Sequence, residues 1–237
     1  MKPACVHLSL LVLLGLPLLL SLNGCGAPRG TATLVVLPAP PWRGLPLRPR
    51  TAAGIPGDPI NLGVEGSRAA LLAAFRKGAW VPADPLSPHN DARLALDFVL
   101  HRSYPRAPVS RLYLFGRPED LALEHELGAV SRRDHVRFWD TRRWDPQTHL
   151  ELWIGDASRD TGVEVVRTHG ILFGTTHHIS PFVDAERRRI VATLCGAGVV
   201  AAVVMEPGIG LTFLGHNGAG DPFVTDGRAA VIVLKGS

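Results

Sequence analysis

The fold is decided by the stretch from Asp134 to Ile179, in which apolar and polar residues alternate. Four segments carry the alternation: HVRFW at 135–139, HLELWIGD at 149–156, VEVVR at 163–167 and ILFGTTHHI at 171–179. A period of two is typical of β-strands, and short spacers between such segments are typical of antiparallel neighbours. We therefore expect four neighbouring antiparallel strands.

Helices and further strands flank this stretch. Before it, we expect a strand at 59–64, a helix between Ser67 and Gly78, a second helix capped by Asn90 or Asp91, and a short strand at 111–116. After it, we expect a helix opened by Ser180 and Pro181, strands at 199–204 and 229–234, and a hairpin turn at Asp226–Gly227. This pattern predicts an α+β fold, with a mixed, mainly antiparallel sheet and helices packed on one face.

Length and composition fit one domain. The chain has 237 residues, of which 46% are apolar, which is enough for a single core. The formal net charge is +4, but Lys and Arg are scattered among Asp and Glu. Because binding to a phosphate backbone needs a concentrated basic face, we expect no nucleic-acid partner.

The N-terminus has the features of a lipoprotein signal. Lys2 precedes an almost wholly apolar run at 8–22, which is shorter than the roughly 20 residues of a membrane-spanning helix. The LNGC sequence at 22–25 resembles the bacterial lipobox, in which the Cys thiol receives a lipid carrying fatty acids such as palmitate. We expect a signal peptide at 1–24 and lipidation of Cys25. An ordinary signal peptide that ends in Cys, or an uncleaved anchor, is the alternative.

A proline-rich tether is expected at 25–50, followed by the domain at 51–237. Prolines stiffen an extended chain, so this segment would hold the domain away from the membrane. The anchor indicates the bacterial cell envelope, and Gly26 in place of Asp favours the outer over the inner membrane. Processing leaves Cys195 as the one thiol without a lipid, and its apolar neighbours predict that it is buried.

Several motifs together resemble the LssY C-terminal domain. They are GDPIN at 57–61, Trp80 with PAD at 82–84, PVSRLYLFGR at 108–117, HVRFW at 135–139, WIG at 153–155, Asp160, THHI at 176–179 and VDAER at 183–187. The resemblance covers roughly residues 50 to 235. That family occurs alone or appended to bacterial membrane proteins of the phosphatidic-acid-phosphatase and DedA types. The resemblance implies a fold and an envelope context, including a membrane-protein partner, but no particular substrate.

Polar residues on one predicted sheet face are the first candidates for a binding site. If Val136 and Phe138 point to the core, then His135 and Arg137 point outward, and the same argument places Glu151, Trp153 and His178 outward. This face could hold an anionic or amphipathic ligand or a membrane partner, through the charge of Arg137 and the apolar surface of Trp153. A solvated face with cross-strand ion pairs, and a core role for His177, is the alternative.

A metal-assisted hydrolase acting on a phosphate ester or lipid is a second functional hypothesis. It would use His135, Asp160 and His178 as metal ligands and catalytic residues, because imidazole and carboxylate suit a divalent metal such as zinc or manganese. The sequence identifies no cofactor beyond this, and it contains no nucleophile elbow, phosphate-binding glycine loop or HExxH motif.

His177 is also a candidate ligand-binding residue, and Asp184 and Arg187 complete the set. These last two residues fall near the start of the expected third helix. A carboxylate in a first turn is also favoured by the helix dipole alone, and Arg187 could pair with it or with Asp160. A structural role for these two residues therefore stays open beside the binding role.

Overall fold

The structure is a computed structural model that describes residues 41–100, 102–129, 132–168, 171–208 and 214–236. The chain divides into two units, Met1–Leu37 and Pro38–Ser237, and all the described residues belong to the second. The expected signal peptide, Cys25 and most of the tether lie outside the described residues. Among those described, no helix combines the length and apolar character needed to cross a membrane.

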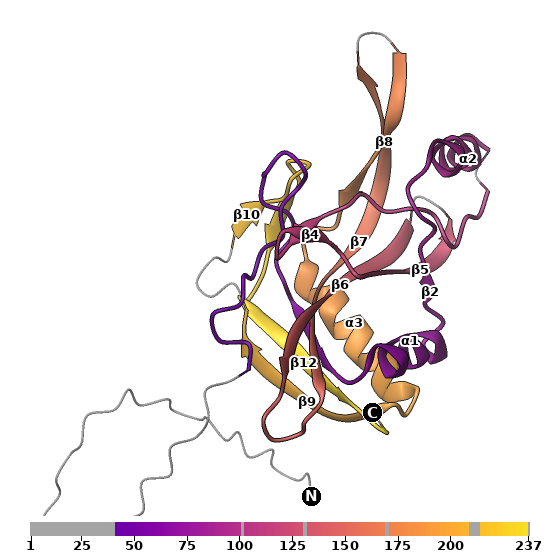
Figure 1. Ribbon diagram of the computed structural model, residues 1–237. Coiled ribbons are helices and arrows are strands. Elements are labelled where there is room, and N and C mark those ends of the chain that lie inside the picture. Colours follow the sequence, from indigo (N-terminus) through magenta and orange to yellow (C-terminus); the bar gives the residue numbers. More distant parts are fainter. Residues whose placement is uncertain (1–40, 101, 130–131, 169–170, 209–213, 237) are drawn as a thin grey trace, which may run out of the picture. The chain divides into compact units, whose positions relative to one another are not determined.

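Three helices and twelve strands make up the described part of the chain (Figure 1). In chain order they are β1 (Leu62–Glu65), α1 (Arg68–Lys77), β2 (Val81–Pro82), α2 (Pro88–Val99), β3 (Tyr113–Leu114), β4 (Arg117–Pro118), β5 (Leu121–Ala129), β6 (Arg132–Trp144), β7 (Glu151–Thr168), β8 (Ile171–Ile179), α3 (Val183–Gly196), β9 (Val200–Pro207), β10 (Leu214–His216), β11 (Pro222–Val224) and β12 (Arg228–Leu234).

Eight of these strands form one mixed sheet. Its order is β2-β5-β6-β7-β1-β12-β9, with β8 paired to β7. β1 runs parallel to β12, and the other pairings in this sheet are antiparallel. Two small sheets, β10 with β11 and β3 with β4, accompany it. The predicted α+β fold with a mixed, mainly antiparallel sheet is confirmed.

β7 is longer than the alternation predicts. The expected strands at 149–156 and 163–167 are parts of one strand of 18 residues. The residues between them stay extended because both neighbours pair with them: β6 pairs with β7 up to Arg159, and β8 pairs with it from Asp160 onward. In Figure 1 the ribbon of β7 and β8 extends away from the rest of the sheet.

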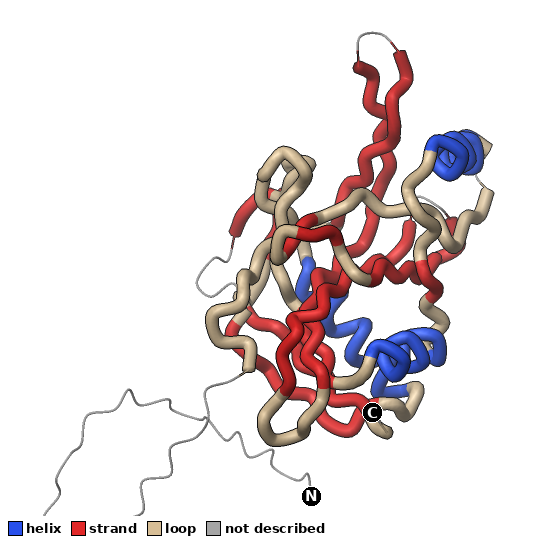
Figure 2. The backbone as a smooth tube through the Cα atoms, in the orientation of Figure 1, coloured by secondary structure: helices blue, strands red, loops and turns tan. Residues whose placement is uncertain are grey.

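The main core lies between one face of the sheet and the helices α1 and α3. Phe75 of α1 packs edge-on against Phe138 of β6, with ring centroids 5.3 Å apart. Ile190 and Leu194 of α3 join the same cluster, as does Trp153 of β7. Figure 2 shows α1 and α3 together on this side and α2 apart from them. The helices are therefore not all on one face, which corrects that part of the prediction.

The second face of the sheet is also covered. Trp139 of β6 and Leu152 and Ile154 of β7 pack there against Leu45 and Leu112. Leu45 belongs to the expected tether, and the neighbouring Arg50 amide donates to the carbonyl of Tyr113 at 2.9 Å. The folded region therefore begins before residue 51, because this segment supplies part of the second apolar layer.

The first residues of the helices agree with the prediction for α1 and differ from it for α2 and α3. Ser67 caps α1 as expected, by accepting from the Ala70 amide at 3.2 Å. α2 begins earlier than predicted because Ser87, instead of Asn90 or Asp91, is the capping side chain and accepts from the Asn90 amide at 3.1 Å. α3 begins at Val183, after Phe182. The predicted opening at Ser180 and Pro181 is wrong because the Pro181 carbonyl accepts from the Val224 amide at 2.7 Å, which keeps this segment extended.

Two smaller expectations are also corrected. Gly227 has a positive φ of 73°, so a turn does occur at Asp226–Gly227. It is not a hairpin, because β11 pairs with β10 while β12 pairs with β1 and β9. Cys195 is exposed instead of buried, because α3 directs Ile190 and Leu194 to the core and leaves the thiol on its outer side.

Candidate functional site

Three basic side chains of β6 occupy the face of the sheet opposite α1 and α3. Val136 and Phe138 point into the main core, so the alternate residues Arg133, His135 and Arg137 point the other way. Their exposed fractions are only 2% to 4%. Buried charge of this kind requires paired groups close by.

The neighbouring strands supply those groups. Residues opposite one another in an antiparallel pair share a face of the sheet. Glu124 of β5 and Ser158 of β7 are both opposite His135, and Asp156 is opposite Arg137. We call the following buried residues the polar cluster: Asp58, Glu124, Arg133, His135, Arg137, Asp156, Ser158 and Asp160.

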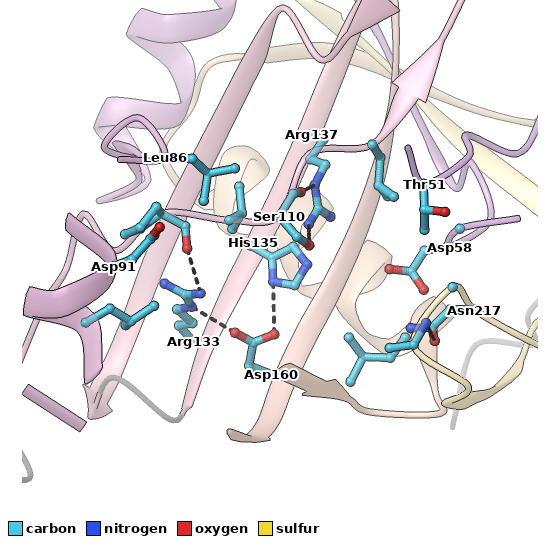
Figure 3. Close-up of a pocket in the computed structure, with 18 residues that line it drawn as sticks. Thr51, Asp58, Leu86, Asp91, Ser110, Arg133, His135, Arg137, Asp160 and Asn217 are labelled. Atoms are coloured by element: carbon cyan, nitrogen blue, oxygen red, sulfur yellow. Dashed lines mark hydrogen bonds and ion pairs between the residues drawn. The ribbon is translucent and has the colours of Figure 1, made fainter. Parts of the chain in front are cut away.

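A cavity of about 430 Å³ opens above the polar cluster (Figure 3). Five members of the cluster line it: Asp58, Arg133, His135, Arg137 and Asp160. Its remaining walls are largely apolar and include Leu86, Leu94, Val109, Leu112 and Ile179. Leu94 belongs to α2, so this helix lies on the cavity side of the sheet. The site therefore combines a charged floor with apolar walls.

His135 connects Asp160 to Ser158. Its Nδ1 atom lies 3.2 Å from Oδ1 of Asp160, and its Nε2 atom lies 2.9 Å from Oγ of Ser158. Burial lowers the pKa of His135, although the Asp160 carboxylate opposes this effect. The imidazole is therefore neutral at neutral pH and carries one N–H.

Arg133 joins two carboxyl groups across three strands. Its Nε atom lies 2.8 Å from Oδ2 of Asp160 and 3.2 Å from Oε2 of Glu124. Its Nη2 atom also donates to the carbonyl of Pro108 at 3.3 Å. Burial raises the pKa of Glu124 well above its usual value, although the Arg133 charge opposes this. The ionised partner of Arg133 is therefore chiefly Asp160.

Arg137 is held at one edge of the cavity. Its Nε atom donates to the carbonyl of Ser110 at 3.1 Å, and its Nη1 atom is 3.6 Å from Oδ1 of Asp156. Burial alone would lower the pKa of Arg137, but the surrounding carboxylates, Asp156 foremost, raise it. Burial also raises the pKa of Asp156 to about 7, against the attraction of Arg137. Arg137 is thus always charged, while Asp156 is only partly ionised near neutral pH.

Nη1 of Arg137 and Oδ1 of Asp58 are among the buried atoms of cavity-lining residues that lack hydrogen bonds. Nη1 of Arg137 is a donor and Oδ1 of Asp58 is an acceptor, and neither has a hydrogen-bond partner among the described residues. An unsatisfied buried polar atom costs about 1–3 kcal/mol, so such atoms call for an explanation. A ligand that offers an acceptor to Arg137 and a donor to Asp58 would satisfy both.

The predicted binding face is only partly assembled. His135 and Arg137 lie together as expected, but Trp153 and Glu151 belong to the helix side of β7. Trp153 is 3% exposed, packs in the main core, and donates from its indole N–H to the Gly66 carbonyl at 3.1 Å. The outward assignment of Trp153 is wrong because both faces of the sheet are covered, so Leu152 and Ile154 fill the second layer. The side chain of His177 lies outside the described part of the structure.

Of the three proposed metal ligands, His135 and Asp160 lie beside each other, whereas His178 contacts Asp221. Asp160 and Ile179 are cross-strand partners and both line the cavity. His178 precedes Ile179 in β8, so its side chain points to the other face, where Nδ1 lies 2.7 Å from Oδ1 of Asp221. Within the described chain, no three His, Cys, Asp or Glu side chains are placed to hold a metal ion together. The donor geometry therefore gives no support to a site made of His135, Asp160 and His178.

Asp184 and Arg187 belong to a different cluster. Arg187 is 3% exposed, and its guanidinium contacts Oδ1 of Asp184 at 3.1 Å and Oδ2 of Asp226 at 2.7 Å. Asp184 also accepts from the hydroxyl of Thr225 at 2.8 Å. These contacts tie the start of α3 to the turn before β12, which is a structural role.

Five of the eight residues of the polar cluster are not identified from the sequence. Asp156, Ser158 and Asp160 alternate along one strand, and this signal was hidden because the expected strand ends at 156. Arg133 precedes the start of the expected strand at 135. Glu124 lies in β5, whose Leu, Ala and Glu residues favour helices, so the strand itself was not expected. Asp58 falls in a motif of the resemblance but carried no predicted role.

The comparisons with known proteins identify the family. The family model described as LssY C-terminus matches residues 42–229. Neither the curated proteins nor the solved structures contain a match to this chain. The match spans the whole sheet up to the start of β12, together with all members of the polar cluster. This chain belongs to the LssY C-terminus family.

Proposed function

We propose that this protein is a lipid-anchored protein of the bacterial envelope whose domain binds a small amphipathic molecule with an oxyanionic head. The observation that carries the proposal is that two buried atoms of opposite hydrogen-bonding character, the donor Nη1 of Arg137 and the acceptor Oδ1 of Asp58, lack hydrogen bonds in residues that line the cavity. A guanidinium donor favours a carboxylate or phosphate oxygen. The acceptor on Asp58 suits an O–H or N–H of the same ligand.

The size and walls of the cavity support an apolar tail. A volume of about 430 Å³ lies within the usual range for small-molecule sites. Leu86, Leu94 and Leu112 lie on its walls, so each methylene that enters would contribute up to about 0.8 kcal/mol. A molecule with a short alkyl chain and one charged end fits both parts of the site.

The anchor rests on the lipobox at 22–25, and Cys25 would be the attachment site. Lipidation would hold the cavity close to a membrane, where amphipathic molecules are concentrated. We propose the outer membrane as the location. A membrane-protein partner in the envelope is compatible with this arrangement.

Calorimetric titration of the purified full chain tests the proposed ligand class. Hexanoate and hexyl phosphate represent the two oxyanions, and hexanol has the same chain without a charge. We expect both anions to bind at least about tenfold more tightly than hexanol, because a charge-assisted hydrogen bond contributes about 1.5–3 kcal/mol. Affinity should also rise from acetate through butanoate to hexanoate.

Matched arginine variants locate the site. Arg137→Met should weaken binding of hexanoate at least about tenfold, whereas Arg188→Met, on the exposed side of α3, should bind like the wild type. A thermal melt of each variant checks that the fold is kept. The proposal is wrong if hexanol binds as tightly as hexanoate, or if the folded Arg137→Met protein binds hexanoate with unchanged affinity.

A further inference from the structure

Three members of the polar cluster lie in the order of a nucleophile, a general base and an orienting acid. Oγ of Ser158 is 2.9 Å from Nε2 of His135, and Nδ1 of the same ring is 3.2 Å from Oδ1 of Asp160. This constellation is recognised by the geometry and roles of its members, whatever their order in the chain. It is built here entirely from neighbouring strands, because His135 and Ser158 are paired across β6 and β7.

The charges around the ring determine where its proton lies. Asp160 is paired with Arg133 at 2.8 Å and is therefore an anionic acceptor. A neutral imidazole has one N–H, and the carboxylate oxygen 3.2 Å from Nδ1 favours that hydrogen on Nδ1, although the contact is not aligned as a hydrogen bond. Nε2 is left with its lone pair, so it accepts the hydrogen of the Ser158 hydroxyl. His135 is thereby poised to take a proton from Ser158.

Ser158 is fully buried, but both of its side-chain partners line the cavity. Besides His135, these include Asp58, whose Oδ2 lies 3.4 Å from Oγ. Ser158 does not itself line the cavity, so a substrate has to reach Oγ between these two side chains. On the same floor, Nη1 of Arg137 is a buried donor without a hydrogen bond, which is the kind of group that stabilises a developing oxyanion.

We propose that Ser158 is the nucleophile of an esterase activity in this cavity, acting on esters of short apolar carboxylic acids. The proposal rests on the proposed function, since the carboxylate ligand inferred there would be the product acid. Oγ of Ser158 attacks the ester carbonyl carbon, and its proton passes to Nε2 of His135. Asp160 stabilises the resulting imidazolium, and Arg137 the tetrahedral oxyanion.

The remaining steps release the products and regenerate the free Ser158 hydroxyl. The C–O bond to the alcohol breaks, and the alcohol leaves with the proton from His135. Water then attacks the acyl group on Ser158 and gives a proton to His135. When the acyl–oxygen bond breaks, that proton returns to Oγ and the carboxylic acid is released. The net reaction is the hydrolysis of one ester to one acid and one alcohol, with no other reactant.

Covalent labelling of the wild-type full chain tests this inference directly. Methanesulfonyl fluoride is small enough for an enclosed site, and it sulfonylates an activated serine with loss of fluoride. We expect mass spectrometry to find the modification on the peptide that contains Ser158. The rate should rise with pH and level off below the usual His pKa of about 6.5, because burial lowers the pKa of His135.

Variants separate catalysis from folding and from ligand binding. Ser158→Ala should lose labelling and hydrolysis of p-nitrophenyl hexanoate but still bind hexanoate, while Ser103→Ala, at an exposed serine, should behave like the wild type. His135→Gln should slow labelling about 100-fold. If wild-type Ser158 is not labelled while hexanoate binds, the esterase inference is overturned and the binding function stands. Hydrolysis that persists in Ser158→Ala would also overturn it.

Discussion

His135 on β6 and Ser158 on β7 are directly opposed across the sheet, with Nε2 and Oγ 2.9 Å apart. The site is therefore fixed by strand register. A slip of one residue between β6 and β7 would turn every second side chain to the other face and remove the polar cluster from the cavity. The packing that holds this register should matter for function as much as the polar residues do.

Gly155 allows β6 and β7 to approach closely on the side of the sheet that faces the main core. A Cβ atom added there would lie 2.7 Å from the carbonyl oxygen of Arg137 and 2.7 Å from a ring carbon of Phe138. We expect Gly155→Ala to lower the free energy of unfolding by about 2 kcal/mol or more, because the crowded atoms include backbone. Gly162→Ala, on the same strand with nothing within 4 Å, is the matched control. Urea denaturation of both variants measures the difference, and equal stabilities would contradict the account of the register.

The stability of the domain should fall between about pH 4.5 and pH 8. Burial raises the pKa of Glu186 to about 8, and the neighbouring Asp134 carboxylate acts in the same direction. A raised folded-state pKa means that the folded protein binds the proton more tightly, so this stabilisation is complete below the unfolded pKa and is lost as pH rises through about 8. Asp156, with a pKa of about 7, contributes with the same sign.

Glu186→Gln tests the origin of this pH dependence. The amide has nearly the same shape as the carboxyl group and does not ionise. We expect the difference in unfolding free energy between pH 5 and pH 8.5 to become smaller in this variant than in the wild type. An identical pH dependence in the two proteins would show that Glu186 titrates normally in the folded state.

Arg187 should be important for stability and not for ligand binding. Its buried guanidinium joins Asp184 and Asp226, and the hydrogen bond from Arg187 is the main cause that lowers the pKa of Asp226. We expect Arg187→Met to cost about 3 kcal/mol of stability and to raise the pKa of Asp226 toward its ordinary value. Chemical denaturation and an NMR titration measure the two effects.

Arg188→Met, one residue along α3 on the exposed side, should change the stability by less than about 0.5 kcal/mol. Equal stabilities of the two arginine variants would contradict the structural role of Arg187.

Cys25 should carry the membrane anchor. Cys25→Ala removes the thiol at the expected lipidation position, so we expect no incorporation of labelled fatty acid and no maturation at this site. Metabolic labelling followed by electrophoresis measures both. If the variant still takes up the label and matures to the wild-type size, the lipoprotein interpretation is wrong.

The sequence predicted the fold better than the site. Alternation in 134–179 was sufficient to predict a mainly antiparallel sheet, because the pattern of Val136 and Phe138 marks one buried face. It does not show that the opposite face is covered too, so it predicts an outward Trp153, although this side chain fills the main core. A period of two separates the faces of a strand but does not say which face meets the helices.

The site depends on contacts that no local pattern encodes. Ser158 and His135 are 23 residues apart, and only the pairing of β6 with β7 shows that they meet. Glu124 enters through a strand whose composition favours a helix, and tertiary pairing overrides that propensity. The residue types of His135 and Asp160 suggest a metal site, whereas the structure brings these two residues together with a serine and two arginines.

The position of a bound ligand tests the central claim most directly. We predict that a crystal structure of the domain with hexanoate will place a carboxylate oxygen within hydrogen-bond distance of Nη1 of Arg137, with the alkyl chain against Leu94 and Leu112. Hexanoate bound elsewhere on the protein, or bound in the cavity with its carboxylate away from Arg137, would contradict the account.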